Sequence, residues 1–295
     1  MRSIDLSFDL LATCQTETIR LLDSFEAAPS RSGLFDVGAV AEIVALGGAV
    51  PGNERIRKTV CDAAARWLQS GILEEFCFSR VELAYYTALL AWLAQSGETY
   101  SPGDMSVMKR LCEGRLIGRS EMPVLTQRLS AAYLSRCGID ADFGDLGERD
   151  LARMIDKRVL RGRSDEYDIL VVIMCAQLLQ LEPHYLRSKP SLYPQALLVQ
   201  AIRSGNTNWT PVLAFLCAHW FALEEGLRSA ALACMLQNLP ARGELLPAPQ
   251  GAVIDSEYIG RAGRGLRIRS TLALAYSLCT PGDCYVEDRA ALAIC

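Results

Sequence analysis

The feature that most constrains the fold is a helical spacing of apolar residues that continues from one end of the chain to the other. Apolar side chains recur three and four residues apart, and the alternation typical of a half-buried strand is almost absent. Glycine and proline separate the periodic segments: Gly71 follows residues 54–69, which Asn53 is expected to cap, and Pro183 follows residues 165–181. The sequence therefore predicts an all-α protein.

The pattern also predicts which helices are enclosed. The expected helices cover residues 6–25, 34–46, 54–69, 80–95, 104–112, 121–136, 148–160, 165–181, 191–203, 211–223, 227–237 and 266–279. Segments that are apolar on nearly every side occur at residues 81–93, 169–181, 212–223 and 272–278, whereas residues 54–69 carry charges on one face. A helix that is apolar all round must be surrounded by others. We therefore expect an inner and an outer layer of helices.

Two helical architectures provide such layers. One is an αα-toroid built from helical hairpins, complete or incomplete, and the other is an irregular helical-repeat solenoid. The fixed repeat length that solenoids show is not apparent, which favours the toroid. Because the pattern does not change along the 295 residues, we expect a single domain, which can be divided at most into residues 1–140 and 141–295.

Composition excludes several classes of protein. An apolar content of 51% is enough for a large core and excludes a disordered chain. The net charge of −4 argues against a general nucleic-acid binder, and no apolar run reaches the roughly 18 residues of a membrane span. Asp5 and Asp9 do not fit a signal peptide. We expect a cytoplasmic protein that binds no membrane, and the excess of Arg over Lys suggests a bacterial source with a GC-rich genome.

The cysteines and histidines do not form a metal-binding pattern. The chain has 11 Cys, none of them spaced Cys-x-x-Cys, and only two His. Most of the cysteines lie inside apolar segments, where a thiol acts as a small hydrophobic group. Cys279 and Cys284 form the closest pair, and a disulfide between them stays open as an alternative. We expect neither a metal nor a cofactor.

One hairpin resembles a known family. Residues 208–213 read Asn-Trp-Thr-Pro-Val-Leu, and residues 236–246 read Leu-Gln-Asn-Leu-Pro-Ala-Arg-Gly-Glu-Leu-Leu. This stretch resembles the hairpin unit of αα-toroids such as terpene cyclases and protein prenyltransferase β-subunits, in which a helix ending in Leu-Gln-Asn is followed by a Gly-centred turn. It is also similar to uncharacterised helical proteins of bacterial natural-product gene clusters. The resemblance covers less than half of the chain and implies a toroid fold.

The catalytic motifs of these families are not matched. Terpene cyclases of one type use an Asp-x-Asp-Asp acid, but the nearest run here is Asp140-Ala141-Asp142-Phe143. Metal-dependent terpene synthases use Asp-Asp-x-x-Asp together with a second motif. The nearest run here, residues 165–168, reads Asp-Glu-Tyr-Asp and is one residue short. The resemblance therefore implies a fold and no particular reaction.

A toroid predicts where a binding site would lie. The N-termini of its inner helices converge on one mouth of the central cavity, and their free N–H groups suit an anionic or carbonyl-bearing ligand. The residues at these positions are Arg80, Glu82, Tyr85, Tyr167, Asp168, Asn208, Trp209, Arg269 and Thr271. Asp168 and Glu82 are candidate acid–base catalysts, and the others are candidate ligand-binding residues. The alternative for Asp168 and Asn208 is that they only cap helices.

His219 and an Arg-rich segment are two further candidates. His219 lies within an apolar helix and is either a base that faces the cavity or a core histidine. Residues 260–269 contain three Gly and four Arg, among them Arg261, Arg264 and Arg267, which could bind a phosphate or a carboxylate. The alternative is a solvated loop. Because no aromatic residues are interleaved with these arginines, the segment does not favour nucleic acid as a partner.

These observations leave two functions open. The first is a protein of bacterial secondary metabolism that binds or processes a small molecule or peptide in an apolar central pocket, without metal or cofactor. The second is a non-catalytic helical scaffold or regulator that docks a partner protein, with the Arg-rich segment as the contact. Whether the chain is an enzyme stays open. An open centre with polar side chains that lack partners would favour the first function, and a filled centre would favour the second.

Overall fold

The computed structural model describes residues 3–48, 50–73, 81–96, 192–221, 223–239, 241–247 and 263–279, together with residues 129–130, 133, 137, 169–171, 173–174 and 177. The described residues contain α-helices and turns and no strand, so the predicted all-α fold is confirmed. None of the described helices is long and apolar enough to cross a membrane.

Eight helices can be followed through the described residues. They are α1 (Ser3–Ala27), α2 (Arg31–Gly47), α3 (Asn53–Ser70), α5 (Val81–Ser96), α11 (Leu192–Arg203), α12 (Trp209–Trp220), α13 (Glu225–Gln237) and α14 (Arg264–Cys279). The first and last residues of each helix lie within three positions of the corresponding ends of a predicted helix. The helices predicted at residues 104–112 and 148–160 lie outside the described residues, as does most of residues 121–136.

Local capping chemistry explains several of the helix ends. The Ser30 hydroxyl accepts a hydrogen bond from the Gly33 N–H at 3.1 Å and begins α2. Gly71 follows α3 with a φ of 75°, the left-handed conformation that glycine adopts without strain. The prediction that glycine ends this helix is confirmed.

The predicted role of Asn53 as the cap of α3 is wrong. Gly52 precedes the helix and Asn53 is its first residue. The buried Asn53 amide donates to the backbone oxygens of Val44, at 3.1 Å, and Gly48, at 3.2 Å, and its Oδ1 accepts a hydrogen bond from the Tyr276 hydroxyl at 2.5 Å. Asn53 therefore joins the start of α3 to α2 and α14, because its side-chain partners come from these two helices and the residue after α2.

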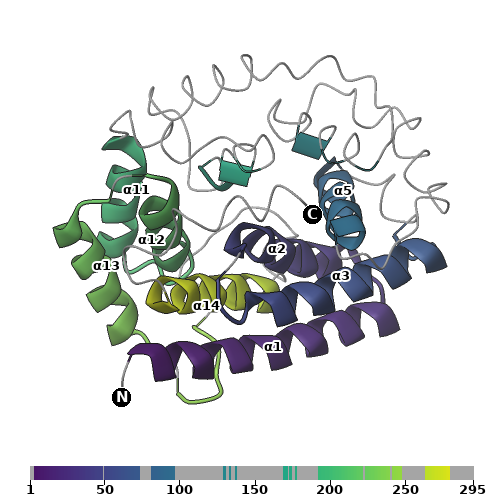
Figure 1. The fold of residues 1–295 in the computed structure, drawn as a ribbon, viewed down its shortest axis with the longest axis horizontal. Helices are drawn as coiled ribbons and strands as arrows, with labels where there is room; N and C mark the ends of the chain where they lie inside the picture. The colour runs from purple at the N-terminus through teal and green to yellow at the C-terminus, as the bar shows by residue number, and fades with distance from the viewer. Residues whose placement is uncertain are drawn as a thin grey trace.

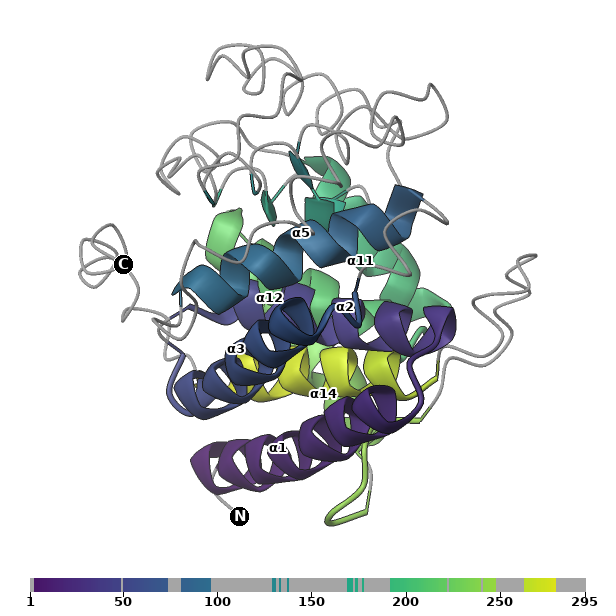
Figure 2. The ribbon, with the colours of Figure 1, turned by 90° about the vertical axis from the view of Figure 1, so that its right-hand side faces the viewer.

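Helix α14 lies in the interior of the described helices (Figures 1 and 2). It packs against α1, α2 and α12, so the last described helix contacts the first. Helix α5 packs against α2 and α3, and α11, α12 and α13 form a separate group in which α12 contacts α14. Segments more than 200 residues apart in the sequence therefore share one core.

Burial follows the predicted pattern in three of the four segments predicted to be enclosed, with one addition; most of the fourth, residues 169–181, lies outside the described residues. Residues 268–276 of α14 and 210–217 of α12 are buried without interruption, and residues 85–91 of α5 are buried as well. Helix α2 is the addition, because its residues 36–47 are all buried although they include two acids, Asp36 and Glu42. The sequence interpretation did not include this helix among the enclosed segments.

Two glycines allow α2 to lie so close to its neighbours. A Cβ atom on Gly265 of α14 would overlap the backbone oxygen of Asp36 on α2. A Cβ atom on Gly38 of α2 would overlap the ring of Tyr86 on α5. Helix α2 is therefore held between two neighbours at distances that only glycine permits at these positions.

Candidate functional site

Four of the residues predicted to line the mouth come together where α12 meets α14. Asn208 and Trp209 lie at the start of α12, and Arg269 and Thr271 lie on α14. The Ser270 hydroxyl donates toward the backbone oxygen of Asn208, at 2.9 Å, and toward its side-chain Oδ1, at 2.8 Å. We call this group the α12–α14 cluster: Asn208, Trp209, Arg269, Ser270 and Thr271.

Arg269 is the centre of the α12–α14 cluster. Its side chain is 3% exposed, and its Nη1 lies 3.7 Å from Oε2 of Glu42, whose side chain is fully buried. The guanidinium carbon lies 4.4 Å from the centre of the Trp209 ring, and Nη2 donates to Oδ1 of Asn208 at 3.4 Å. An ion pair, a cation–π contact and a hydrogen bond therefore surround this buried charge.

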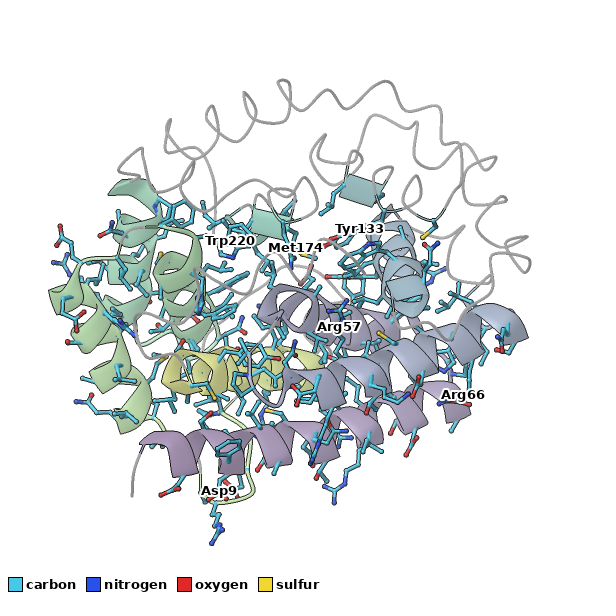
Figure 3. The ribbon with its side chains drawn as sticks, viewed as in Figure 1. Asp9, Arg57, Arg66, Tyr133, Met174 and Trp220 are labelled. Carbon is cyan, nitrogen blue, oxygen red and sulfur yellow. The ribbon has the colours of Figure 1, made fainter. Side chains whose placement is uncertain are left out.

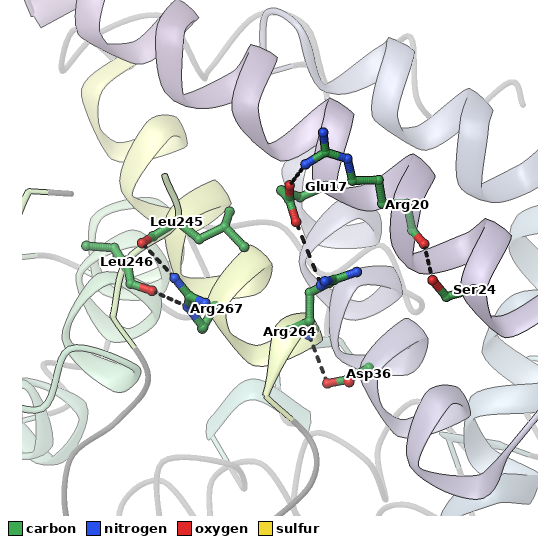
Figure 4. A network of polar contacts seen from close by, with 9 residues as sticks. Glu17, Arg20, Ser24, Asp36, Leu245, Leu246, Arg264 and Arg267 are labelled. Atoms are coloured by element: carbon green, nitrogen blue, oxygen red, sulfur yellow. Dashed lines mark hydrogen bonds and ion pairs between the residues drawn. The ribbon is translucent and has the colours of Figure 1, made fainter. Parts of the chain in front are cut away.

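Thr271 and Arg267 bind a segment of the chain itself. The Thr271 hydroxyl accepts a hydrogen bond from the Leu246 N–H at 3.0 Å. Arg267 donates from Nε to the Leu246 oxygen at 2.7 Å and from Nη2 to the Leu245 oxygen at 3.2 Å (Figure 4). Both leucines are buried. A predicted ligand-binding residue and a predicted anion-binding residue thus hold residues 241–247 against α14.

The remaining arginines of the Arg-rich segment lie in different settings. Arg264 begins α14, and its Nε is 3.7 Å from the Glu17 carboxylate on α1 (Figure 4). Glu17 also pairs with Arg20 of the same helix. Arg261 lies outside the described residues. An anion site in this segment stays a prediction, and Arg267 would have to leave two backbone carbonyls to take part in it.

The N-terminus of α12 is capped by Asn206. Its Oδ1 accepts hydrogen bonds from the backbone N–H groups of Asn208, at 3.1 Å, and Trp209, at 3.0 Å. The Thr210 N–H donates to the backbone oxygen of Asn206 at 3.0 Å, and Pro211 has no N–H. Asn208 occupies the N-cap position of α12, as the alternative interpretation had it, but its side chain makes no capping hydrogen bond and bonds Ser270 and Arg269 instead.

The N-terminus of α14 is capped by Asp36 of α2. Its Oδ1 accepts a hydrogen bond from the Gly265 N–H at 2.8 Å. Burial raises the pKa of this carboxyl from 3.8 to about 6, against the opposing effects of the Gly265 hydrogen bond and the Arg264 charge. A carboxylate of the chain therefore occupies the positive end of this helix, where the sequence predicted an anionic ligand.

Tyr85 lies in an aromatic part of the core on α5. Its hydroxyl donates to the Met174 sulfur at 3.2 Å, and its ring centre lies 5.1 Å from that of Tyr86 and 6.5 Å from that of Tyr133. Met174 and Tyr133 are labelled in Figure 3. The ring is fully buried. The one polar atom that Tyr85 could offer to a ligand is thus bonded within the core.

The structure places fewer contacts for the predicted catalytic residues and for the remaining ligand-binding candidates. His219 is buried in α12 and packs edge-on against Phe215, with 4.5 Å between the ring centres. This position fits the core alternative, and the role of a base stays a prediction. Glu82 lies in α5, but its side chain lies outside the described residues, as do Arg80, Tyr167 and Asp168.

A small hollow of about 10 Å³, room for about one water molecule, lies beside the α12–α14 cluster. Its walls come from the turn before α12, the first turn of α12, the end of α13 and the segment held by Arg267. It is lined by Gly205, Asn206, Thr207, Thr210, Pro211, Cys234, Met235, Asn238 and Leu246. We call it the α12–α13 hollow. Among the side chains that the structure places, no three His, Cys, Asp or Glu lie together in a way that could hold a metal ion.

The sequence interpretation missed several residues of this region. Asp36, Glu42, Asn206 and Ser270 were not among the candidates. The two acids did carry a signal, because each interrupts the apolar run of α2, and a charge in a buried helix needs a partner. Nothing in a single sequence signals the partners of Asn206 and Ser270.

Comparisons with protein-family models, with curated proteins and with solved structures found no match to this chain. The function must therefore be argued from the geometry of the described residues.

Proposed function

We propose that the protein is a non-catalytic helical scaffold that binds a partner protein on its outer surface. The observation that supports this proposal is the state of the predicted ligand-binding groups. Arg269, Asn208 and Thr271 bond to other residues of the chain, and protein groups cap the N-termini of both α12 and α14. Because these groups already form hydrogen bonds and ion pairs between parts of the chain, we infer a structural role for this region.

The proposal includes a ring of helices of the αα-toroid type. In an open solenoid each repeat contacts only its neighbours, so the first and last helices lie apart. Here α14 packs against both α1 and α2. This contact supports a closed arrangement, in which the last hairpin meets the first.

The proposal also places the protein in a reducing compartment, such as a bacterial cytoplasm. Cys14, Cys61, Cys137 and Cys217 are buried free thiols. Unpaired cysteines used as core residues are typical of proteins that are not exposed to oxidising surroundings.

A second candidate function is favoured by two buried atoms. Nε of Arg269 and Oγ1 of Thr210 have no hydrogen-bond partner among the described residues. Leaving such a group buried without a partner costs about 1–3 kcal/mol, which a bound molecule with suitable acceptors would offset. The second candidate is therefore a protein that binds a small molecule or peptide, as in bacterial natural-product biosynthesis, with Asp168 and Glu82 as its candidate catalysts.

One variant distinguishes the two functions. Glu42→Leu combined with Arg269→Met removes both buried charges and keeps side chains of similar length, so we expect the variant to fold. If the protein is a scaffold, native mass spectrometry of the wild type and of the variant should give the mass of the chain alone. Both proteins should also recover the same partner from extracts of the native host. A stoichiometric small molecule on the wild type that the variant lacks would overturn the scaffold and support the second candidate.

A further inference from the structure

A segment that belongs to no helix is held on α14 by side chains. We call residues 244–247, which read Glu-Leu-Leu-Pro, the strap. Within residues 241–247 the two leucines are buried and the other residues are exposed. The strap is therefore anchored at two consecutive positions and is open to solvent on either side of them.

The anchor includes hydrogen bonds to the strap backbone. Arg267 donates to the oxygens of Leu245 and Leu246 (Figure 4), and the Thr271 hydroxyl accepts from the Leu246 N–H. Arg267 and Thr271 are four residues apart on α14, so they lie on the same face of that helix. Each of these bonds goes to a backbone group, so they bind the strap whatever its side chains are.

The two leucine side chains supply the selectivity. Leu245 is 5% exposed and Leu246 is 1% exposed. Leu246 lines the α12–α13 hollow together with Pro211 of α12 and Met235 of α13. Because the hollow has room for about one water molecule, the strap fills nearly all of the space beside these helices. Another segment can bind here only by taking the place of the strap.

The residues that hold the strap lie on helices with other contacts. Helix α14 packs against α1 and α2, and Ser270 of α14 bonds Asn208 at the start of α12. Release of the strap should therefore leave α12 and α14 in place. It should expose the Arg267 guanidinium and two spaces of leucine size, which we call the strap site.

We propose that the strap site is the docking site for the partner of the scaffold, and that the partner inserts a non-helical segment with two consecutive leucines in place of the strap. The strap is then an autoinhibitory contact, because it occupies the site until the partner displaces it. A second copy of this chain offers the same contacts as the tethered strap and gains nothing by exchange, whereas a partner segment with further contacts does. This inference rests on the scaffold proposal, since it names the surface and the segment that join the two proteins.

Binding of a free peptide tests the strap site. The probe is a fluorescently labelled peptide with the sequence of residues 241–247, Ala-Arg-Gly-Glu-Leu-Leu-Pro, and its anisotropy is measured with the full-length chain. Leu245→Ser combined with Leu246→Ser releases the strap. This released variant should bind the peptide at least about tenfold more tightly than the wild type, in which the tethered strap competes.

Two controls accompany the peptide measurement. Arg242→Ser changes an exposed position of the same segment and should keep the wild-type affinity. A peptide with serine in place of both leucines should bind neither chain. Equal affinity of the wild type and the released variant for the leucine peptide would overturn the proposal.

Hydrogen exchange on the wild type tests the strap without a variant. The Leu246 N–H donates to Thr271, and Leu272 and Leu274 lie in the middle of α14. The protection factor of the Leu246 N–H should be lower than theirs by at least about 100-fold, because the strap opens locally. Equal protection of all three would show that the strap opens only when the chain unfolds, which would overturn the proposal.

Partner capture separates this inference from the scaffold proposal. Extracts of the native host are passed over the immobilised wild-type chain with and without excess peptide, and displacement of the partner by the peptide is the expected result. A partner that stays bound would overturn the strap site and leave the scaffold intact. Recovery of no partner would overturn the scaffold and this inference with it. A dimer that forms with rising concentration and is absent in the released variant would place the strap of a second copy at the site, which would overturn the partner assignment.

Discussion

Glu42 and Arg269 show at the scale of single residues how this fold tolerates buried charge. Moving an ion out of water costs several kcal/mol, and attraction to a partner offsets this cost only when other contacts help. Here Trp209 and Asn208 provide those contacts from α12, while Glu42 faces Arg269 from α2. The ion pair and these contacts therefore fix the position of α14 along both α2 and α12.

Removing one partner of this ion pair should be far worse than removing both. Arg269→Met leaves the Glu42 carboxylate buried opposite an apolar side chain, and we expect a loss of about 3–5 kcal/mol in the free energy of unfolding. Combining it with Glu42→Leu should recover most of that loss. Urea unfolding of the wild type, both single variants and the double variant measures this difference. Additive losses in the double variant would contradict a direct interaction between the two residues.

Asp36 should make stability depend on pH in an unusual direction. Burial raises its pKa from 3.8 to about 6, so the folded chain binds the proton more tightly than the unfolded chain does. Its contribution to stability is therefore full below about pH 4 and is lost as the pH rises through about 6. Between pH 4 and 7 the wild type should lose up to about 3 kcal/mol relative to Asp36→Asn, whose neutral amide still accepts from Gly265.

The measurement for Asp36 is the unfolding free energy as a function of pH. This carboxyl faces the backbone N–H groups of Gly263, Arg264 and Gly265 and the charge of Arg264, which itself pairs with Glu17. The exposed carboxyl of Asp23 on α1 provides a control through Asp23→Asn. If the wild type and Asp36→Asn show parallel pH profiles, Asp36 does not titrate in this range.

At the scale of elements, the close crossing of α2 and α14 depends on Gly265. A Cβ atom at this position would overlap backbone atoms of Asp36, which cannot move aside as a side chain could. Gly265→Ala should therefore separate the two helices and lower the free energy of unfolding by several kcal/mol, beyond any gain in helix propensity. It should also weaken the cap that Asp36 makes on α14.

Gly226 provides a matched control for this substitution. It also lies near the start of a helix, α13, but a Cβ atom there would meet nothing within 4 Å. Gly226→Ala should be neutral or should stabilise the chain by up to about 1 kcal/mol. Thermal unfolding of the two variants beside the wild type makes the comparison. A similar effect of both substitutions would show that the crossing is looser than the structure has it.

The helices could be predicted from the sequence because their signals are local. Apolar spacing, glycine stops and proline in the first turn act within a few residues, and all eight described helices were expected. The contacts between helices could not be predicted in this way. Asn53 looked like a cap because its bonds to Val44 and Tyr276 depend on packing between elements, and Arg269 looked like a ligand-binding residue because its partner Glu42 lies on α2, far away in the sequence.

For the whole molecule, the central question is whether the described helices unfold together or as independent repeats. Helix α14 contacts α1, α2 and α12, and its Leu272 is fully buried at its middle. In the proposed ring, a destabilising substitution in α14 should also destabilise helices from both ends of the chain. In a solenoid it should affect only the nearest repeat.

Leu272→Ala tests this directly by hydrogen exchange. Truncating a fully buried leucine costs about 2–5 kcal/mol, and we expect the opening free energies of α1, α2 and α12 to fall together by that amount. Leu236→Ala on α13, where the side chain is 41% exposed, should change them little. If only α12 loses protection while α1 keeps it, the two ends of the chain are not energetically coupled. The contact between α14 and α1 would then join separate units instead of closing one cooperative ring.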